Sequence, residues 1–95
     1  MQRLPEAIVR EALAALPRWS GDTNAIAATF GFDTYEAGVA FAVQVALLAQ
    51  RMDHHPDLTI GWRRVTVTYT THDAGGVTGR DLAAARAVDA IAPRS

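Results

Sequence analysis

Residues 58–72 alternate between apolar and polar side chains, and this alternation restricts the possible folds more than any other feature of the chain. Val65, Val67 and Tyr69 would share one face of an extended strand, with threonines and a histidine on the opposite face. Apolar residues at 58, 60 and 62 follow the same period. A strand with one apolar and one polar face is typical of an antiparallel sheet covered on one side.

Two segments with helical periodicity precede these strands. The first helix is predicted to start at Pro5, whose fixed φ and missing N–H suit the first helical position, and Pro17 is predicted to end it. The second is predicted to be capped by Asp33 and to carry an apolar stripe at spacings of three and four. Pro56 sets its end, because the residue before a proline disfavours helical geometry.

The remaining segments complete the predicted fold. Residues 19–24 and 25–32 are interpreted as two short strands, and Thr78 with Asp81 forms a capping-box pattern at the start of a last helix. The order is α-β-β-α-β-β-α. We therefore expect an α+β fold, in which a four-stranded antiparallel sheet has three helices packed on one face, within a single domain over residues 1–95.

Composition and charge exclude several classes of function. The chain has no cysteine, so disulfides and thiol catalysis are excluded. Its longest apolar run is far shorter than the roughly 20 residues that cross a bilayer, and the N-terminus lacks a signal-peptide core. The net charge is −1, and the adjacent pair Arg63–Arg64 is interpreted as solvated. We expect a cytoplasmic protein that binds neither nucleic acid nor membrane.

All three histidines of the chain lie at the ends of predicted elements. His54 and His55 end the second helix, and His72 ends the last strand on its polar face. Imidazole suits proton transfer near neutral pH, and three imidazoles can also hold zinc. Adjacent histidines point in different directions on regular structure, and the two-histidine zinc motif is absent. We therefore favour acid–base chemistry and expect no metal.

Three further side chains have both a structural and a functional interpretation. Asp81 fits a helix cap, where a carboxylate also meets the positive end of the helix dipole, and it can serve a site as well. Trp62 suits either the core or a platform for a flat heterocycle, and Trp19 shares this ambiguity. The residues alone leave both roles open.

The histidine segment resembles the signature of pterin-4a-carbinolamine dehydratases. The positions that carry the resemblance, at matching spacing, are His54, His55, Pro56, Trp62, His72 and Asp81. Residues 71–81 are similar to that family's passage from strand to helix. Upstream, the positions similar to its pattern are Trp19, Phe30, Phe32, Tyr35, Ala37 and Phe41. The resemblance covers nearly the whole chain.

The resemblance implies an enzyme that dehydrates 4a-hydroxytetrahydropterin to quinonoid dihydropterin. This reaction recycles the cofactor of aromatic amino acid hydroxylases, and the enzyme needs no metal or cofactor of its own. A homodimer or homotetramer is also implied. A second function stays open, since the family fold serves as a dimerisation cofactor of a transcription factor, and similar domains act as assembly factors for Rubisco. The sequence does not identify such a protein partner.

The resemblance also assigns site residues. His54 and His72 match the acid–base histidines, His55 matches a second pocket histidine, and Asp81 matches an acidic residue near the pocket. The implied substrate-binding positions are Gln50, Asp53, Pro56, Trp62, Thr71, Asp73 and Trp19.

Gln50 departs from the family's pattern, which usually has an acidic residue four positions before the first histidine. Positions four apart share a helix face, so Gln50 is expected to hydrogen-bond towards His54 without supplying a negative charge. We therefore expect weaker activity, or activity shifted to lower pH.

Overall fold

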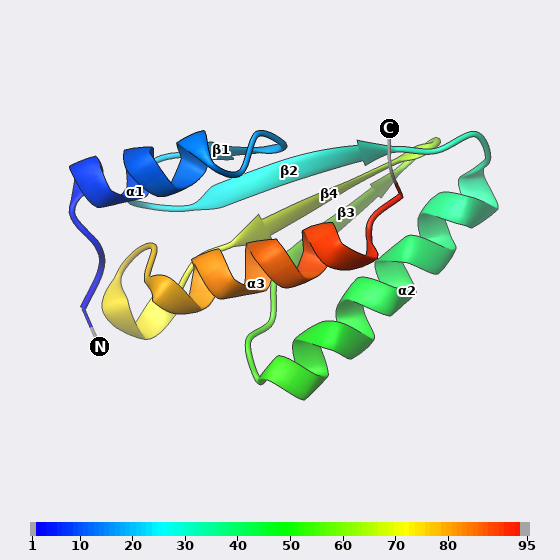
Figure 1. The fold of residues 1–95 in the computed structure, drawn as a ribbon. Coiled ribbons are helices and arrows are strands. Elements are labelled where there is room, and N and C mark those ends of the chain that lie inside the picture. Colours follow the sequence, from blue (N-terminus) through cyan, green and yellow to red (C-terminus); the bar gives the residue numbers. More distant parts are fainter. Residues whose placement is uncertain (1, 94–95) are drawn as a thin grey trace.

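A computed structural model describes residues 2–93 of the chain. Its elements, in order, are α1 (Glu6–Ala14), β1 (Trp19–Gly21), β2 (Ile26–Gly31), α2 (Tyr35–Met52), β3 (Asp57–Gly61), β4 (Arg64–Tyr69), the 3-10 turn η1 (His72–Ala74) and α3 (Gly79–Ile91). The order α-β-β-α-β-β-α is therefore confirmed, and Figure 1 shows the helices lying along one side of the sheet.

The four strands form one antiparallel sheet in the order β1-β2-β4-β3. Val65, Val67 and Tyr69 of β4 are buried, whereas the threonines between them are partly exposed, as the alternation predicts. In β2, Ile26 lies opposite Tyr69 and Phe30 lies opposite Val65. The paired apolar residues therefore share the face that the helices cover.

Each of the three helices contributes to the same core. Val9 of α1, Val45 of α2 and Val88 of α3 are buried in one cluster with the apolar face of the sheet. This clustering confirms that the three helices pack on one face. Within residues 2–93, no helix has both the length and the apolar character needed to cross a membrane.

Two predicted helix starts are wrong by one residue. Pro5 is the residue before α1 rather than its first residue. The cap of α2 is Thr34, whose hydroxyl accepts a hydrogen bond from the Ala37 N–H at 3.1 Å. Asp33 lies one residue too early for this contact and stays exposed. A hydroxyl caps a helix as well as a carboxylate does, so the neighbouring polar residues could not be distinguished from their type alone.

Two strands end earlier than predicted. β1 stops at Gly21, because the Asp22 carboxylate accepts a hydrogen bond from the Asn24 N–H at 2.7 Å and closes a turn. β4 stops at Tyr69, so His72 does not end a strand but opens the turn η1. This short loop is closed by backbone hydrogen bonds between Thr71 and Gly76, which place the histidine beside the start of α3.

Candidate active site

The end of α2 separates its two histidines. The helix stops at Met52, and Asp53 adopts the left-handed conformation with φ 53° while its N–H bonds the last turn. The His54 N–H still reaches the Ala49 carbonyl at 3.1 Å. This reversal of the chain turns His54 inward, where it is 8% exposed, and leaves His55 exposed.

His54 is joined to Asp81 across the space between α2 and α3. Its Nε2 lies 2.5 Å from Oδ1 of Asp81, which is 0% exposed. The other carboxylate oxygen accepts hydrogen bonds from the Thr71 hydroxyl and the Thr78 N–H, both at 2.8 Å. A buried carboxylate is tolerated only when it is well hydrogen-bonded, and these three donors meet that need. Asp81 is thus both a helix cap and the anchor of a histidine.

Tyr69 packs against the imidazole of His54. Its ring is stacked on the imidazole, with 5.4 Å between the ring centroids and 17° between the planes. Burial, together with the negative charge of Asp81, raises the pKa of the Tyr69 hydroxyl to about 12. The phenol therefore stays neutral at physiological pH.

A cavity of about 240 Å³ opens beside this group. The residues that line it are Asp53, His54, His55, Thr70, Thr71, His72, Asp73 and Arg80. The structure thus brings together the three histidines, which come from two distant segments. Asp53, Thr71 and Asp73, which were also predicted, border the same cavity. One anchored imidazole and two exposed ones around a small cavity can donate and accept protons on a bound molecule.

The two tryptophans do not line this cavity. Trp19 is 3% exposed, and its indole N–H donates to the Asp89 carboxylate at 2.9 Å, so it is a core residue rather than a ligand platform. Trp62 is 73% exposed in the turn between β3 and β4, where Arg63 lies over its ring. That turn is at the opposite end of β4 from His72.

Gln50 contacts a different histidine from the one predicted. Its Oε1 lies 2.8 Å from Nε2 of His55, whereas His54 is bound to Asp81. The expectation of a bond towards His54 is wrong, because the left-handed Asp53 carries His54 to the opposite side of the chain. Pro56 follows His55 and leads into β3 without lining the cavity.

Arg80 and Thr70 line the cavity without having been predicted. The Arg80 guanidinium donates to the Asp53 carbonyl and so joins the start of α3 to the end of α2. The only signal in the sequence is that Arg80 precedes the capping Asp81 in the first turn of α3. The position of Arg80 in the sequence indicates a role at the cavity only when the packing of α2 against α3 is known.

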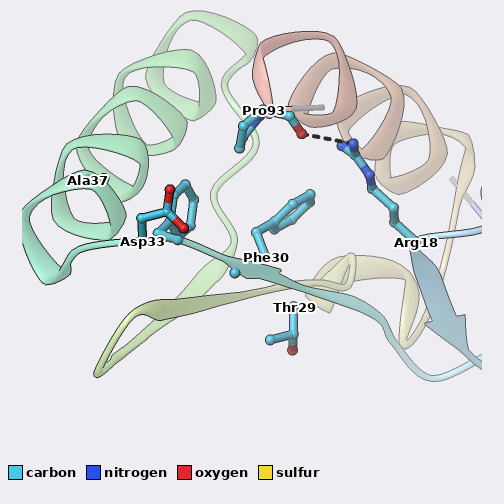
Figure 2. A pocket seen from close by; sticks show the side chains of 8 residues that line it. Arg18, Thr29, Phe30, Asp33, Ala37 and Pro93 are labelled. Carbon is cyan, nitrogen blue, oxygen red and sulfur yellow. Dashed lines mark hydrogen bonds between the residues drawn. The ribbon is translucent and has the colours of Figure 1, made fainter. Parts of the chain in front are cut away.

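A larger cavity of about 550 Å³ lies at the opposite end of the sheet (Figure 2). Its lining residues are Arg18, Thr29, Phe30, Gly31, Phe32, Asp33, Ala37 and Pro93. Figure 2 shows the Arg18 side chain reaching the Pro93 carbonyl, at 2.9 Å. Among the residues that the structure describes, none that lines this cavity is a histidine. Its larger volume therefore does not make it the candidate active site.

Comparison with known proteins identifies similar sequences over nearly the whole chain. The family model described as pterin 4 alpha carbinolamine dehydratase matches residues 2–91. A protein from Chloroflexus aurantiacus that carries a provisional pterin-4-alpha-carbinolamine dehydratase name is 47% identical over 96% of this chain and 98% of its own. A relative from Natronomonas pharaonis with the same provisional name is 47% identical over 86% and 90% of the two chains.

Two solved structures share the fold. A transcriptional coactivator/pterin dehydratase from Brucella melitensis superposes with a TM-score of 0.89 at 39% identity, covering 97% of this chain and 100% of its own. A pterin dehydratase-like protein described as a RuBisCO assembly factor in the alpha-carboxysome superposes with a TM-score of 0.65 at 26% identity. That match covers 82% of this chain and 90% of the assembly factor.

Proposed function

The chain belongs to the pterin 4 alpha carbinolamine dehydratase family, and on this premise we propose that it dehydrates a 4a-hydroxytetrahydropterin to the quinonoid dihydropterin. The observation that carries the proposal is the convergence of three histidines on one cavity, one of them anchored to a buried carboxylate. The dehydratase names that the relatives carry support the same reaction.

The proposed reaction needs one acid and one base. The 4a-hydroxyl accepts a proton, its C–O bond breaks, and water leaves with the bonding electrons. A ring N–H loses its proton, and that electron pair forms the new C=N bond. No net oxidation occurs, so two positioned imidazoles supply the required chemistry. Acid–base groups of this kind typically contribute about 10²–10⁴-fold each.

We assign the base to His54 and the acid to His72. Asp81 accepts a hydrogen bond from each of its three partners, so Nε2 of His54 carries the proton that it donates there and the other ring nitrogen is free to accept one. The same carboxylate stabilises the imidazolium that then forms, as in catalytic triads. His72 lies on the other segment that lines the cavity and is exposed. It can therefore meet the departing hydroxyl.

The remaining polar residues at the rim suit the edge of a pterin. Asp53 and Asp73 offer carboxylate acceptors for its amino and ring N–H groups, and Arg80 offers donors for its oxo group. His55, held by Gln50, adds a further donor or acceptor. Thr71 acts through Asp81, since its hydroxyl is already bound there.

The test is to mix freshly generated 4a-hydroxytetrahydropterin with the purified protein and follow formation of the quinonoid product by absorbance. The initial rate should rise in proportion to protein concentration above the spontaneous rate. Arg63→Ala, in the turn far from the cavity, is the control and should match the wild type. A rate that is independent of protein concentration would contradict the proposal.

A second candidate function, protein binding, is favoured by the outer face of α2. Val43 and Leu47 lie four residues apart and are both exposed, so they form an apolar pair outside the core. An exposed pair with this spacing suits a groove on another protein, or a second copy of this chain in a homodimer or homotetramer. Light scattering of the wild type and Leu47→Glu, alongside turnover, separates self-association from catalysis. A wild-type mass equal to one chain would contradict self-association.

A further inference from the structure

Tyr69 contacts two other rings at the candidate site. It is stacked on His54, and its ring centroid lies 6.2 Å from that of Trp19, with an angle of 39° between the planes. Trp19 is itself held by its hydrogen bond to Asp89 on α3. Tyr69 is 0% exposed, so its ring is held by the close packing around it and presents a rigid face to the imidazole.

This face supplies a restraint that the hydrogen bond to Asp81 cannot. One hydrogen bond to Nε2 fixes a single atom of the imidazole and leaves the ring free to swing about that contact. A ring stacked at 17° holds the plane of the imidazole as well. Together the two contacts determine how the remaining edge of His54 faces the cavity.

The hydroxyl of Tyr69 is not explained by packing. It is buried and has no hydrogen-bond partner among residues 2–93. A buried hydroxyl without a partner lowers stability, whereas a phenylalanine would supply the same ring without that cost. Its neutrality, which follows from a pKa of about 12, leaves the ring face uncharged against His54.

We propose that Tyr69 is a positioning residue for His54, whose ring holds the imidazole in the orientation needed for proton transfer. This inference rests on the proposed dehydratase function. It also gives Trp19 an indirect role, because its ring supports Tyr69 instead of contacting the substrate. The alternation in β4 indicated only that Tyr69 is a core residue.

The test compares Tyr69→Leu, which removes the ring, with the conservative variant Tyr69→Phe, which keeps it. The matched control is Val67→Ala, two residues earlier on the same buried face of β4 and outside the cavity lining. Tyr69→Leu should lower kcat by roughly 2- to 12-fold, the scale of an aromatic pair, with little change in KM. Tyr69→Phe should restore kcat, and Val67→Ala should lower the melting temperature without lowering kcat.

A second readout does not depend on turnover. The Nε2 proton of His54 lies in a 2.5 Å contact with Asp81 and should give a downfield proton NMR signal. We expect this signal to shift or broaden in Tyr69→Leu and to remain in Tyr69→Phe. Should Tyr69→Leu fail to fold, Tyr69→Met takes its place, because a flexible apolar chain fills the space without a ring.

The outcomes are distinguishable. No turnover by the wild type would refute the proposed function, and the NMR comparison would still test the positioning of His54. Wild-type kcat and an unchanged signal in Tyr69→Leu would overturn the inference. So would an equal loss of kcat in Tyr69→Phe, which would assign the effect to the hydroxyl, or an equal loss in Val67→Ala, which would assign it to stability.

Discussion

Replacing Asp81 with alanine should destabilise the fold more than any other change to a single carboxylate of the site. Its two oxygens accept hydrogen bonds from His54, the Thr71 hydroxyl and the Thr78 N–H. Because Asp81 is 0% exposed, water cannot take its place without opening the structure. Asp81→Ala therefore leaves the buried His54 and Thr78 N–H donors without their acceptor and removes one half of the capping box of α3. The Thr71 hydroxyl keeps a partner, because the Thr78 hydroxyl lies 2.9 Å from it.

The size of the loss follows from these contacts. Leaving a buried donor without its acceptor costs about 1–3 kcal/mol, so the loss of the acceptor for the His54 and Thr78 donors should together cost roughly 2–6 kcal/mol. A single domain is stabilised by only about 5–15 kcal/mol. Asp81→Ala should therefore remove a large fraction of the free energy of unfolding.

Urea unfolding followed by circular dichroism measures this loss. The matched control is Asp73→Ala, an exposed carboxylate at the rim of the same cavity, which should change the free energy of unfolding by less than about 0.5 kcal/mol. A loss below about 1 kcal/mol for Asp81→Ala would contradict this expectation, since it would mean that the His54 and Thr78 donors find other partners.

Three further predictions follow from the contacts of the fold and the site. Gln50→Glu should move the NMR signals of His55 and not those of the neighbouring histidine, because only His55 is in contact with position 50; the reverse pattern would contradict the described geometry. Folding raises the pKa of the Tyr69 hydroxyl from 10.0 to about 12, so the unfolded chain loses this proton at a lower pH than the folded protein does. The free energy of unfolding should therefore be unaffected by Tyr69 below pH 10 and should fall between pH 10 and 12, by up to about 1.4 kcal/mol per pH unit. Unfolding curves of Tyr69→Phe should lack that part of the slope, and an identical slope would count against the buried phenol. Thr34→Ala should lower the free energy of unfolding by about 1 kcal/mol, and Asp33→Ala should lower it much less. The opposite ranking would indicate that Asp33, and not Thr34, caps α2.

The features that could be predicted from the sequence are those set by periodicity. In β4, the alternation of Val65 and Val67 with threonines was enough to identify the covered face, because a strand directs successive side chains to opposite sides. The capping box of Thr78 and Asp81 was likewise readable, since both partners lie within one helical turn.

The details that failed depend on the path of the chain over one or two residues. The sequence does not reliably indicate that an aspartate adopts the left-handed conformation. The left-handed conformation of Asp53 nevertheless directs His54 towards Asp81 and leaves His55 in contact with Gln50. Trp19 could not be placed either, because an indole suits a core and a pocket equally well until its neighbours are known.

The most direct test of the central claim is the rate at which wild type, His54→Ala and His72→Ala dehydrate 4a-hydroxytetrahydropterin. We expect turnover well above the spontaneous reaction for the wild type, and a fall of about 100-fold or more in each variant, the scale of a lost acid–base group. Folded wild-type protein that gives no acceleration would contradict the proposed function, and variants that keep the wild-type rate would contradict the roles assigned to the two histidines.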